Sequence, residues 1–569
     1  MENIEWNQTV DVVVAGSGAG GMSAALTGHL EGLDVLLVEK TDRIGGSTAV
    51  SGGAIWIPLN PGAAAAGHGD DSYEKVWEYL QQIVGRASPD DLKEAYLRNG
   101  PEMLDYMRAH QVLDVATRTY SPDYYPDSPG AALGGRVVDP TPFDGKRLGA
   151  HFKELRDPLK EFVVLGGMMV TVTDVYQLLA ATRSPKSFWY SGKLVLAFWL
   201  DRLRGYHRGT RLLLGNALAG QLFLAVLKHK IPYRLGTAAR RLHRDESGRV
   251  IGITVDHNGT EHHIRTRKGV VVATGGFPWN AQLRAEYFPK PTGPWSMSPE
   301  GDSGDGIVMM RDAGAVMGTG HVAPASWAPV SLWKKPDGTM TRYPHLVWER
   351  AKPGLIAVNQ NGERFVNEST SYHEFVKAMY ASGEKPDIPA WLICDRQFID
   401  TWGLGLALPG GRPRQHLIRD RYLIEAPSLA ALAGKIGVDA QRLQATVARY
   451  NQFAAKAEDP DFGKGSTAYN RNLGDPSHKP NPCLRTIGDG PYYAVQVVAG
   501  DIGTSCGIHT DPGARALDAE GQAIPGLFVA GNDMQSVFGG TYPGSGITLG
   551  PALTFGWMAG RALAAMNNG

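Results

Sequence analysis

Residues 11–40 read "DVVVAGSGAGGMSAALTGHLEGLDVLLVEK", and this stretch decides the fold of the 569-residue chain. It opens with a short apolar run rich in β-branched residues, which predicts a buried strand. A glycine-rich turn follows, then a segment whose alanine and leucine spacing predicts a helix, and then a second apolar run that ends near Glu39. The order strand, turn, helix, strand indicates a βαβ unit and an α/β fold.

The turn of this unit has the spacing GxGxxG, with Gly16, Gly18 and Gly21. Glycines let the backbone approach a pyrophosphate closely, and the first turn of the following helix offers its N–H groups. Glu39 stands where such folds place the carboxylate that accepts a ribose hydroxyl. We therefore expect a dinucleotide to contact Gly16, Ser17, Gly18, Ala19, Gly20, Gly21, Glu39 and Lys40.

Three other stretches indicate which dinucleotide is bound. "RIGGSTAVSGG" (43–53) offers small side chains and N–H donors that suit a flat, polar-edged ring system. "GVVVATGGF" (269–277) and "GLFVAGND" (526–533) are further apolar runs that end in glycine. Strand-to-glycine junctions spread along the chain indicate one dinucleotide domain assembled from distant pieces.

This distribution resembles the FAD-binding flavoproteins of the succinate dehydrogenase and fumarate reductase type. The resemblance implies an FAD that is not covalently attached, because the segment around "GGST" contains no histidine. It also implies that the flavin and pyrophosphate contact a second set of residues, namely Gly46, Ser47, Thr48, Ser51, Gly52, Gly53, Thr274, Gly275, Gly276, Gly531 and Asn532, with Ser545 and Ile547 in the C-terminal flavin segment.

Composition narrows the class of partner. The chain has 57 basic and 57 acidic residues, and this balance argues against a nucleic-acid footprint. Its three cysteines are widely spaced and contain no CxxC pair, so we expect neither a metal site nor a disulfide framework. The N-terminus passes directly into a strand without a signal-type segment. We expect a cytoplasmic protein whose partner is small and uncharged.

The expected architecture is a Rossmann-like FAD-binding domain, residues 1–284 and 491–569, with an inserted α+β catalytic domain at 285–490. Within the first part, residues 155–208 predict a mostly helical extension. Its apolar runs are interrupted by charged residues and are too short to cross a membrane. We expect it to pack on the surface, and the alternative is contact with a membrane surface or a second copy of the chain.

A closer resemblance extends over nearly the whole chain outside residues 155–208. It rests on several stretches in order, among them "GGSTAVSGGAIWIP" (45–58), "PDYYPDSPGA" (122–131), "RFVNESTSYHEF" (364–375) and "TYPGSG" (541–546). They resemble the 3-ketosteroid Δ1-dehydrogenases. In that family a tyrosine takes the C2 proton of a 3-oxosteroid, the flavin takes the C1 hydride, and a second tyrosine and a glycine N–H bind the C3 oxygen. The resemblance therefore implies a neutral 3-oxosteroid as substrate.

Carried onto this sequence, the resemblance assigns carbonyl binding to Tyr542 and Gly546, whose O–H and N–H would form an oxyanion site. Tyr372 is the expected base, with His373 beside it as the rival. A phenol of ordinary pKa is a poor base at neutral pH and needs help. The family supplies another tyrosine for this, which Tyr124 matches, with Tyr125 as the alternative.

Other reactions stay open. In the related 3-oxo-5α-steroid 4-dehydrogenases a serine follows the tyrosine by two positions, whereas Ser545 follows Tyr542 by three. Desaturation at C4–C5, reduction of an enoate as in fumarate reductases, and flavin binding without steroid turnover are the alternatives to C1–C2 desaturation. The electron acceptor cannot be inferred from the sequence. Trp295, Trp327 and Phe538 are either core or pocket residues.

Overall fold

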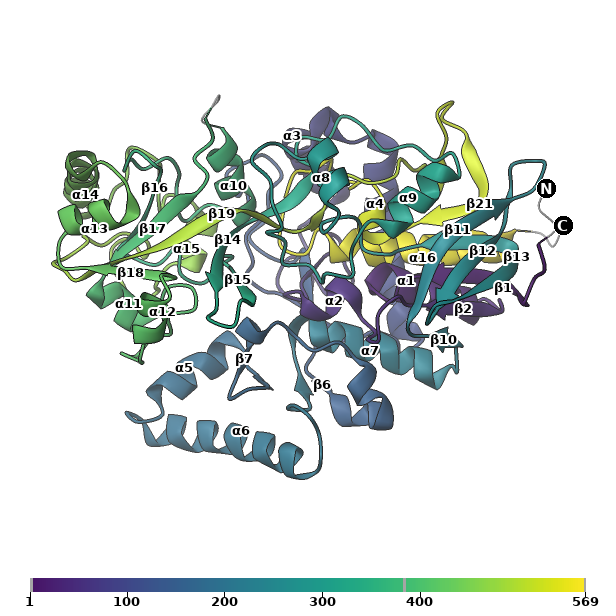
Figure 1. Ribbon diagram of the computed structural model, residues 1–569, viewed down its shortest axis with the longest axis horizontal. Helices are drawn as coiled ribbons and strands as arrows, with labels where there is room; N and C mark the ends of the chain where they lie inside the picture. Colours follow the sequence, from purple (N-terminus) through teal and green to yellow (C-terminus); the bar gives the residue numbers. More distant parts are fainter. Residues whose placement is uncertain (1–3, 382–384, 567–569) are drawn as a thin grey trace.

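The computed structural model describes residues 4–381 and 385–566. Two sheets dominate it, one at each end of an elongated molecule, and a helical extension projects below them (Figure 1). The N-terminal and C-terminal segments lie side by side at the end that carries the first sheet.

The first sheet has eight strands and contains the βαβ unit expected from residues 11–40. Its order is β10-β2-β1-β13-β12-β11, with β21 pairing with β13 and β20 pairing with β21. The strands β10, β2, β1, β13 and β21 are parallel, and the meander β11-β12-β13 is antiparallel as its turn residues predict. The bounds are β1 Gln8–Ala15, β2 Val35–Val38, β10 Tyr233–Arg234, β11 Thr237–Arg244, β12 Val250–His257, β13 Thr260–Val272, β20 Arg515–Leu517 and β21 Ala523–Val529.

Helix α1 (Ala19–Leu30) follows the glycine turn and is buried on almost every face. It packs against α16 (Leu549–Ala565) and α7 (Leu214–Lys228), which are also largely buried. Small residues permit the close contact: a Cβ on Gly556 would lie 2.3 Å from the carbonyl oxygen of Gly20. The C-terminal helix thus completes the domain that the N-terminal strand begins.

The second sheet has six strands in the order β15-β14-β19-β17-β16, with β18 pairing with β19, and every pairing is antiparallel. Its central strand β19 lies beyond the expected boundary at residue 490, so the second sheet takes a strand from the segment expected to complete the FAD-binding domain. The bounds are β14 Ala325–Lys334, β15 Met340–Pro344, β16 Leu355–Val358, β17 Ala390–Asp395, β18 Leu423–Ala426 and β19 Tyr492–Thr504.

Shorter elements connect and cover the two sheets. The small strands are β3 Ile55–Trp56, β4 Val115–Thr117, β5 Val137–Pro140, β6 Phe143–Asp144 and β9 Arg211–Leu212. The remaining helices of the body are α2 Gly46–Val50, α3 Tyr73–Ile83, α4 Asp90–Ala109, α8 Ala281–Tyr287, α9 Asp305–Asp312, α10 Tyr372–Tyr380, α11 Arg396–Trp402, α12 Gln415–Arg419, α13 Leu429–Ile436, α14 Ala440–Ala454 and α15 Ala468–Leu473.

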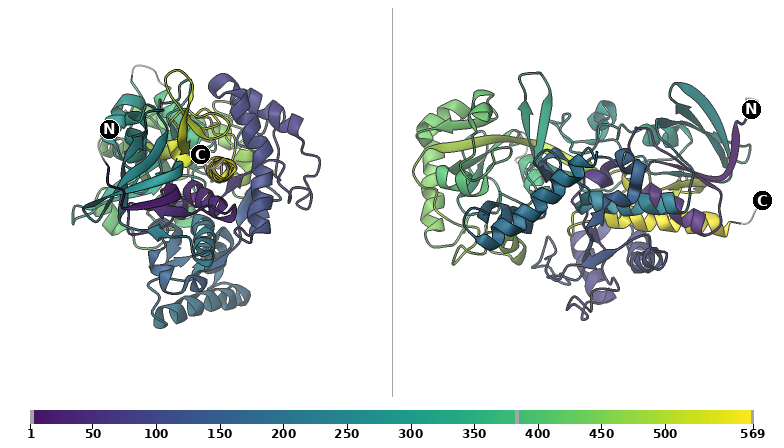
Figure 2. Two further views of the ribbon diagram at one scale, coloured as in Figure 1. Left: turned by 90° about the vertical axis from the view of Figure 1, so that its right-hand side faces the viewer. Right: turned by 90° about the horizontal axis from the view of Figure 1, so that it is seen from below.

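Residues 155–208 form the projecting extension (Figures 1 and 2). It consists of the hairpin β7 (Val163–Val164) and β8 (Met168–Met169), helix α5 (Val172–Ala180) and helix α6 (Pro185–Leu203). Sequence explains where both helices begin: Thr171 and Asp174 form a capping box, and the Ser184 side chain caps α6 ahead of a proline in its first turn. Within the described part of the chain, no helix is both long enough and apolar enough to span a bilayer.

Candidate active site

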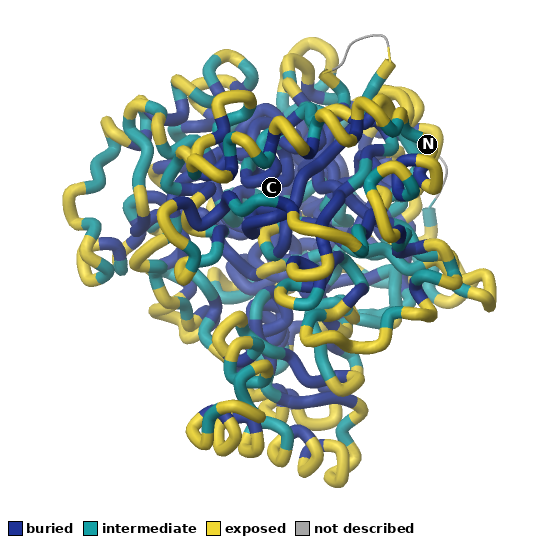
Figure 3. Tube along the Cα trace, turned by 90° about the vertical axis from the view of Figure 1, so that its left-hand side faces the viewer, coloured by how far each residue is buried: buried dark blue, intermediate teal, exposed yellow. Residues whose placement is uncertain are grey.

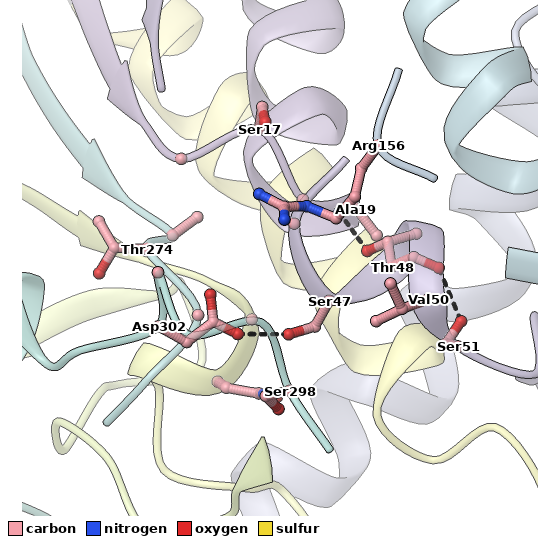
Figure 4. Close-up of a pocket in the computed structure, with 18 of the residues that line it drawn as sticks. Ser17, Ala19, Ser47, Thr48, Val50, Ser51, Arg156, Thr274, Ser298 and Asp302 are labelled. Carbon is pink, nitrogen blue, oxygen red and sulfur yellow. Dashed lines mark hydrogen bonds between the residues drawn. The ribbon is translucent and has the colours of Figure 1, made fainter. Parts of the chain in front are cut away.

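A cleft follows the carboxyl ends of the parallel strands, and its lining extends from the glycine turn at Gly16 to the start of α16 at Leu549 (Figure 4). A dinucleotide, which is longer than most small ligands, suits a cleft that so many separate segments line. Most residues expected to bind the cofactor line it, namely Gly16, Ser17, Gly18, Ala19, Gly20, Glu39, Lys40, Gly46, Ser47, Thr48, Ser51, Gly52, Thr274, Gly275, Gly531 and Asn532.

Five expected cofactor residues do not line the cleft. Gly21 packs helix against turn, since a Cβ there would lie 1.8 Å from the carbonyl oxygen of Gly16. Gly53 has a positive φ of 76° and is packed against Leu214 and Gly215. The other three are Gly276, whose N–H donates to Asp533, Ile547, which lines a smaller neighbouring cavity, and Ser545, which lies in the loop between Tyr542 and Gly546.

Hydrogen bonds fix the carboxylate of Glu39, which follows β2. The Ser17 hydroxyl donates to Glu39 Oε2 at 2.6 Å, and the Thr41 N–H donates to Oε1 at 2.9 Å. The carboxylate is therefore held at the rim of the cleft, as expected for a ribose acceptor. Lys40 is engaged differently, because its Nζ pairs with Asp305 Oδ2 at 2.8 Å across the cleft edge.

The sequence analysis missed three ionisable residues that line the cleft: Asp305, which pairs with Lys40, and also Arg156 and Asp302. Arg156 reaches over the Ala19 and Thr48 end of the cleft (Figure 4), and its Nη2 donates to Thr41 Oγ1 at 2.8 Å. Among the described residues, its buried Nε has no partner. Asp302 accepts a hydrogen bond from Ser47, and burial raises its pKa to about 8. The glycine-rich "GDSGDG" at 301–306 could have pointed to Asp302, but no motif surrounds Arg156.

The three tyrosines expected from distant motifs meet in one buried cluster. Tyr124, Tyr372 and Tyr542 are 8%, 6% and 2% exposed. The Tyr124 hydroxyl donates to the Tyr372 hydroxyl at 3.1 Å. The Tyr542 ring stacks on Tyr124 with 5.3 Å between centroids and meets Tyr372 edge-on at 5.2 Å. We call these three residues, with Tyr469 described below, the tyrosine cluster.

The rival residues lie in different surroundings. The Tyr125 hydroxyl donates to Glu374 Oε1 at 2.6 Å, away from Tyr372. His373 Nδ1 accepts from the Trp327 N–H at 3.3 Å, and burial lowers its pKa to about 3, so the imidazole is neutral and weakly basic. The geometry favours Tyr124 over Tyr125 and Tyr372 over His373, whose catalytic roles stay predictions.

Tyr469 completes the tyrosine cluster, and a buried arginine, Arg350, holds the backbone next to it. The Tyr469 ring, in α15, lies 4.6 Å from that of Tyr124. Arg350 is 2% exposed and donates to four backbone carbonyls, those of His345, Leu346, Glu368 and Thr370. Two of these carbonyls precede Tyr372 by a few residues, so the guanidinium fixes the start of α10. No sequence motif marked either residue.

The burial of the phenols has an electrostatic consequence. Burial, and then the neighbouring Tyr124 and Tyr542, raise the pKa of Tyr372 well above its ordinary value. The positive charge of Arg350 has the opposite effect on the pKa of the tyrosines, because a guanidinium and a nearby phenolate stabilise each other. In the resting protein the phenols are therefore protonated at neutral pH.

One loop joins the tyrosine cluster to the cleft. Tyr542 and Gly546 stand in it, and Thr548 and Leu549, a few residues later, line the cleft. The loop is bonded to the segment of Tyr124, whose N–H donates to the Pro543 carbonyl at 2.9 Å. Gly546 has a φ of 96°, and a Cβ on it would lie 2.4 Å from the Ala54 carbonyl oxygen. This position therefore requires glycine.

The remaining candidates have structural surroundings. Glu368 is fully buried between Arg364 and Lys464 and accepts the Ala357 N–H, so it links three segments of the second domain. Trp327 and Phe538 belong to the hydrophobic core and do not line the cleft.

Comparison with known proteins agrees with this geometry. The chain matches the FAD binding domain family over residues 11–549. It is 38% identical to a 3-oxosteroid 1-dehydrogenase of Mycolicibacterium smegmatis, covering 98% of each chain. The crystal structure of 3-ketosteroid Δ1-dehydrogenase from Sterolibacterium denitrificans, in complex with 1,4-androstadiene-3,17-dione, superposes with a TM-score of 0.90 at 39% identity, covering 98% of this chain and 100% of that one. The chain belongs to the 3-ketosteroid Δ1-dehydrogenase family.

Membership in this family makes the protein an FAD-dependent oxidoreductase. A second similar relative has a smaller substrate by its name: the 4-oxocyclohex-2-ene-1-carboxylate 5-dehydrogenase of Sinomonas cyclohexanicum is 38% identical over 99% of this chain and 95% of its own. The 3-ketosteroid Δ4-(5α)-dehydrogenase of Rhodococcus jostii shares the fold, with a TM-score of 0.67 at 23% identity.

Proposed function

We propose that the protein introduces a C1–C2 double bond into a 3-oxosteroid. The observation that carries this proposal is the hydroxyl pair of Tyr124 and Tyr372, 3.1 Å apart and packed on Tyr542 beside the flavin cleft. The names of the similar dehydrogenases support the steroid as substrate class.

The cleft residues fit FAD. The turn of Gly16 to Gly20 and the first N–H groups of α1 would face the pyrophosphate, and Glu39 would accept a ribose hydroxyl. Ser47, Thr48 and Asp302 lie further along the cleft, where a polar chain or ring edge would pass. Held without a covalent bond, FAD supplies the hydride acceptor for C1 of the substrate.

The tyrosine cluster performs the proton chemistry in this proposal. Tyr542 O–H and Gly546 N–H bind the C3 oxygen, and each such donor typically stabilises the developing enolate by ~3 kcal/mol. Tyr372 then takes the proton from C2. The Tyr124 hydroxyl, 3.1 Å from that of Tyr372, is placed to relay the proton that Tyr372 takes. The buried Arg350 adds a positive charge in a medium where charges interact strongly.

A second candidate substrate class deserves a test, because two similar relatives are named for 4-oxocyclohexane carboxylates. Both classes share a six-membered ring with a ketone, so the tyrosine cluster would serve either. The apolar cleft residues Leu159, Met297 and Leu346 favour the steroid, whereas Arg156 could bind a carboxylate. The position of Ser545 keeps desaturation at C4–C5 as the third candidate.

The decisive experiment is anaerobic mixing of the FAD-loaded protein with androst-4-ene-3,17-dione. Bleaching of the flavin band with a 1,4-diene product is the expected result. Bleaching only with the saturated 3-oxosteroid, and a 4-ene product, would move the assignment to C4–C5. Bleaching only with 4-oxocyclohexanecarboxylate would move it to the smaller ketones, and no bleaching with any of them would contradict the proposal.

The partners and location follow as proposals too. The proposed substrate is a neutral 3-oxosteroid, and the electron acceptor is left open. The proposed contact of residues 155–208 is with either a membrane surface or a second copy of the chain. The cysteines Cys394, Cys483 and Cys506 are buried and unpaired, which fits a reducing cytoplasm.

A further inference from the structure

The loop of residues 541–546 carries both proposed donors to the C3 oxygen, and one tryptophan holds two of its residues. The backbone N–H of Trp56 donates to the Gly546 carbonyl at 3.1 Å. A Cβ on Gly544 would lie 2.6 Å from the indole nitrogen of Trp56, so Gly544 packs directly on that ring. Trp56 is fully buried and is therefore a rigid support for the loop.

Asp123 holds the indole nitrogen of Trp56. Its Oδ1 accepts the Trp56 Nε1–H at 3.1 Å, and its Oδ2 accepts the Arg136 Nη1–H at 2.8 Å and the Ala132 N–H at 3.0 Å. Asp123 and Arg136 are 2% and 1% exposed, in a body whose interior Figure 3 shows as buried. A buried carboxylate is confined by its donors, because moving away from them would leave a buried charge unpaired.

Arg136 connects this carboxylate to the rest of the fold. Its Nε and Nη2 donate to the two carboxylate oxygens of Asp71 at 2.9 and 2.7 Å, and Nη2 also donates to the Gly130 carbonyl at 2.7 Å. Strand β3, which ends at Trp56, pairs with β5, which begins one residue after Arg136. The guanidinium therefore ties Asp123 to the small sheet that carries Trp56.

Asp123 also stands next to the proposed proton relay. It directly precedes Tyr124, whose N–H donates to the Pro543 carbonyl of the loop at 2.9 Å. Asp123 thus lies on two paths into the same loop, one through the indole of Trp56 and one through the backbone of Tyr124. The first path ends at Gly546, the proposed N–H donor.

We propose that Asp123 and Trp56 are positioning residues of the oxyanion site, and that together they fix the Gly546 N–H relative to the Tyr124 hydroxyl. This inference rests on the proposed function. An enolate is stabilised by a donor that is aimed in advance at the developing charge, and a displacement of about 1 Å can lower a rate by about 100-fold. Neither residue donates to the substrate in this proposal, so their contribution is geometric.

The test uses the FAD-loaded protein and androsta-1,4-diene-3,17-dione labelled with ¹³C at C3, which cannot be desaturated again at C1–C2. Isotope-edited infrared difference spectroscopy measures its C3 carbonyl stretch, whose frequency falls when hydrogen-bond donors polarise the bond. The parent protein should lower this frequency, and Asp123→Asn should lose about half or more of that shift. Trp56→Phe keeps the backbone N–H, removes the indole donor and should lose a similar share.

Stopped-flow flavin reduction by androst-4-ene-3,17-dione gives the kinetic counterpart. At saturating substrate both variants should reduce the flavin about tenfold or more slowly, with a substrate dissociation constant within about threefold of the parent value. Asp459→Asn is the matched control, because Asp459 is also buried and accepts hydrogen bonds from an arginine, Arg364, and a backbone N–H, that of Lys464, in the second domain. It should match the parent in both measurements.

Flavin absorbance and the melting temperature show that each variant is folded and loaded, and Trp56→Phe decides the question where Asp123→Asn does not fold. A carbonyl shift equal to that of the parent in the folded variants, or an equal loss in Asp459→Asn, would overturn the positioning role. The parent protein tests the proposed function separately. If it bound the dienone without lowering the carbonyl frequency, the oxyanion site itself would fail. A parent shift that Tyr542→Phe diminishes and Asp123→Asn leaves intact would contradict the positioning role alone.

Discussion

The flavin cleft and the tyrosine cluster are adjacent but are encoded differently in the chain. The cleft consists mainly of backbone and small side chains at strand ends, so its residues stand in short motifs such as 16–21 and 45–53. The cluster consists of large side chains drawn from residues 124 to 542, and only the folded chain brings them together. In the proposed function, cofactor binding is therefore encoded locally, whereas the proton chemistry depends on tertiary structure.

The substitution Tyr372→Phe is expected to have the largest effect and to distinguish the role of the tyrosine cluster from that of the cleft. We expect turnover to fall by about 1000-fold, because general base catalysis typically contributes ~100- to 10,000-fold and phenylalanine leaves no group to take the C2 proton. Stopped-flow flavin reduction measures this rate, and flavin absorbance measures cofactor content. The content should equal that of the parent protein. If the variant instead lost bound FAD while its FAD-loaded fraction reacted at the parent rate, Tyr372 would be needed for cofactor binding and not for proton transfer.

Tyr542→Phe tests the other role in the cluster. Removing one oxyanion donor should lower turnover by roughly 100-fold and leave FAD content unchanged. Tyr125→Phe is the matched control, since its hydroxyl bonds to Glu374 outside the cluster. An unchanged rate for Tyr542→Phe would remove this phenol from the mechanism.

The dependence of turnover on pH separates Tyr372 from His373. Burial raises the pKa of Tyr372 well above its ordinary value, so the deprotonated fraction, and with it the rate, should rise about tenfold per pH unit from about pH 6 to about pH 9. Burial lowers the pKa of His373 to about 3, so a histidine base would already be deprotonated throughout that range. A flat profile of flavin reduction would therefore favour His373 over Tyr372.

The sequence predicted most residues that line the cleft where strands end. The glycines of "GSGAGG" and the carboxylate of Glu39 follow strand ends, and strand ends can be recognised from apolar runs. It also predicted the tyrosines that stand in recognisable motifs. Tyr469 and Arg350 could not be predicted, because their roles come from packing against Tyr124 and from bonds to carbonyls more than ten residues away. The same limit applies to β19, which pairs in the second sheet although residues 491–569 were grouped with the FAD-binding domain: strand pairing between distant segments leaves no local pattern.

Arg156→Ala refines the comparison, because this residue belongs to the cleft and yet comes from a segment without a motif. Among the described residues its buried Nε has no partner, and it lines the cleft beside Ala19 (Figure 4), so we expect its guanidinium to contact the pyrophosphate of FAD. A charge-assisted hydrogen bond typically contributes ~1.5 to 3 kcal/mol, so the dissociation constant of FAD should rise about tenfold.

Titration of the apoprotein with FAD, followed by flavin fluorescence, measures that constant, and Arg183→Ala, an exposed arginine of the same extension, is the control. Turnover of the fully loaded Arg156→Ala variant should stay within about twofold of the parent protein, since Arg156 has no contact with the tyrosine cluster in this proposal. Unchanged FAD affinity with a raised KM for 4-oxocyclohexanecarboxylate would mean that Arg156 binds a substrate carboxylate. The cleft would then encode the choice of substrate as well as the cofactor, and the division between the two regions would no longer hold.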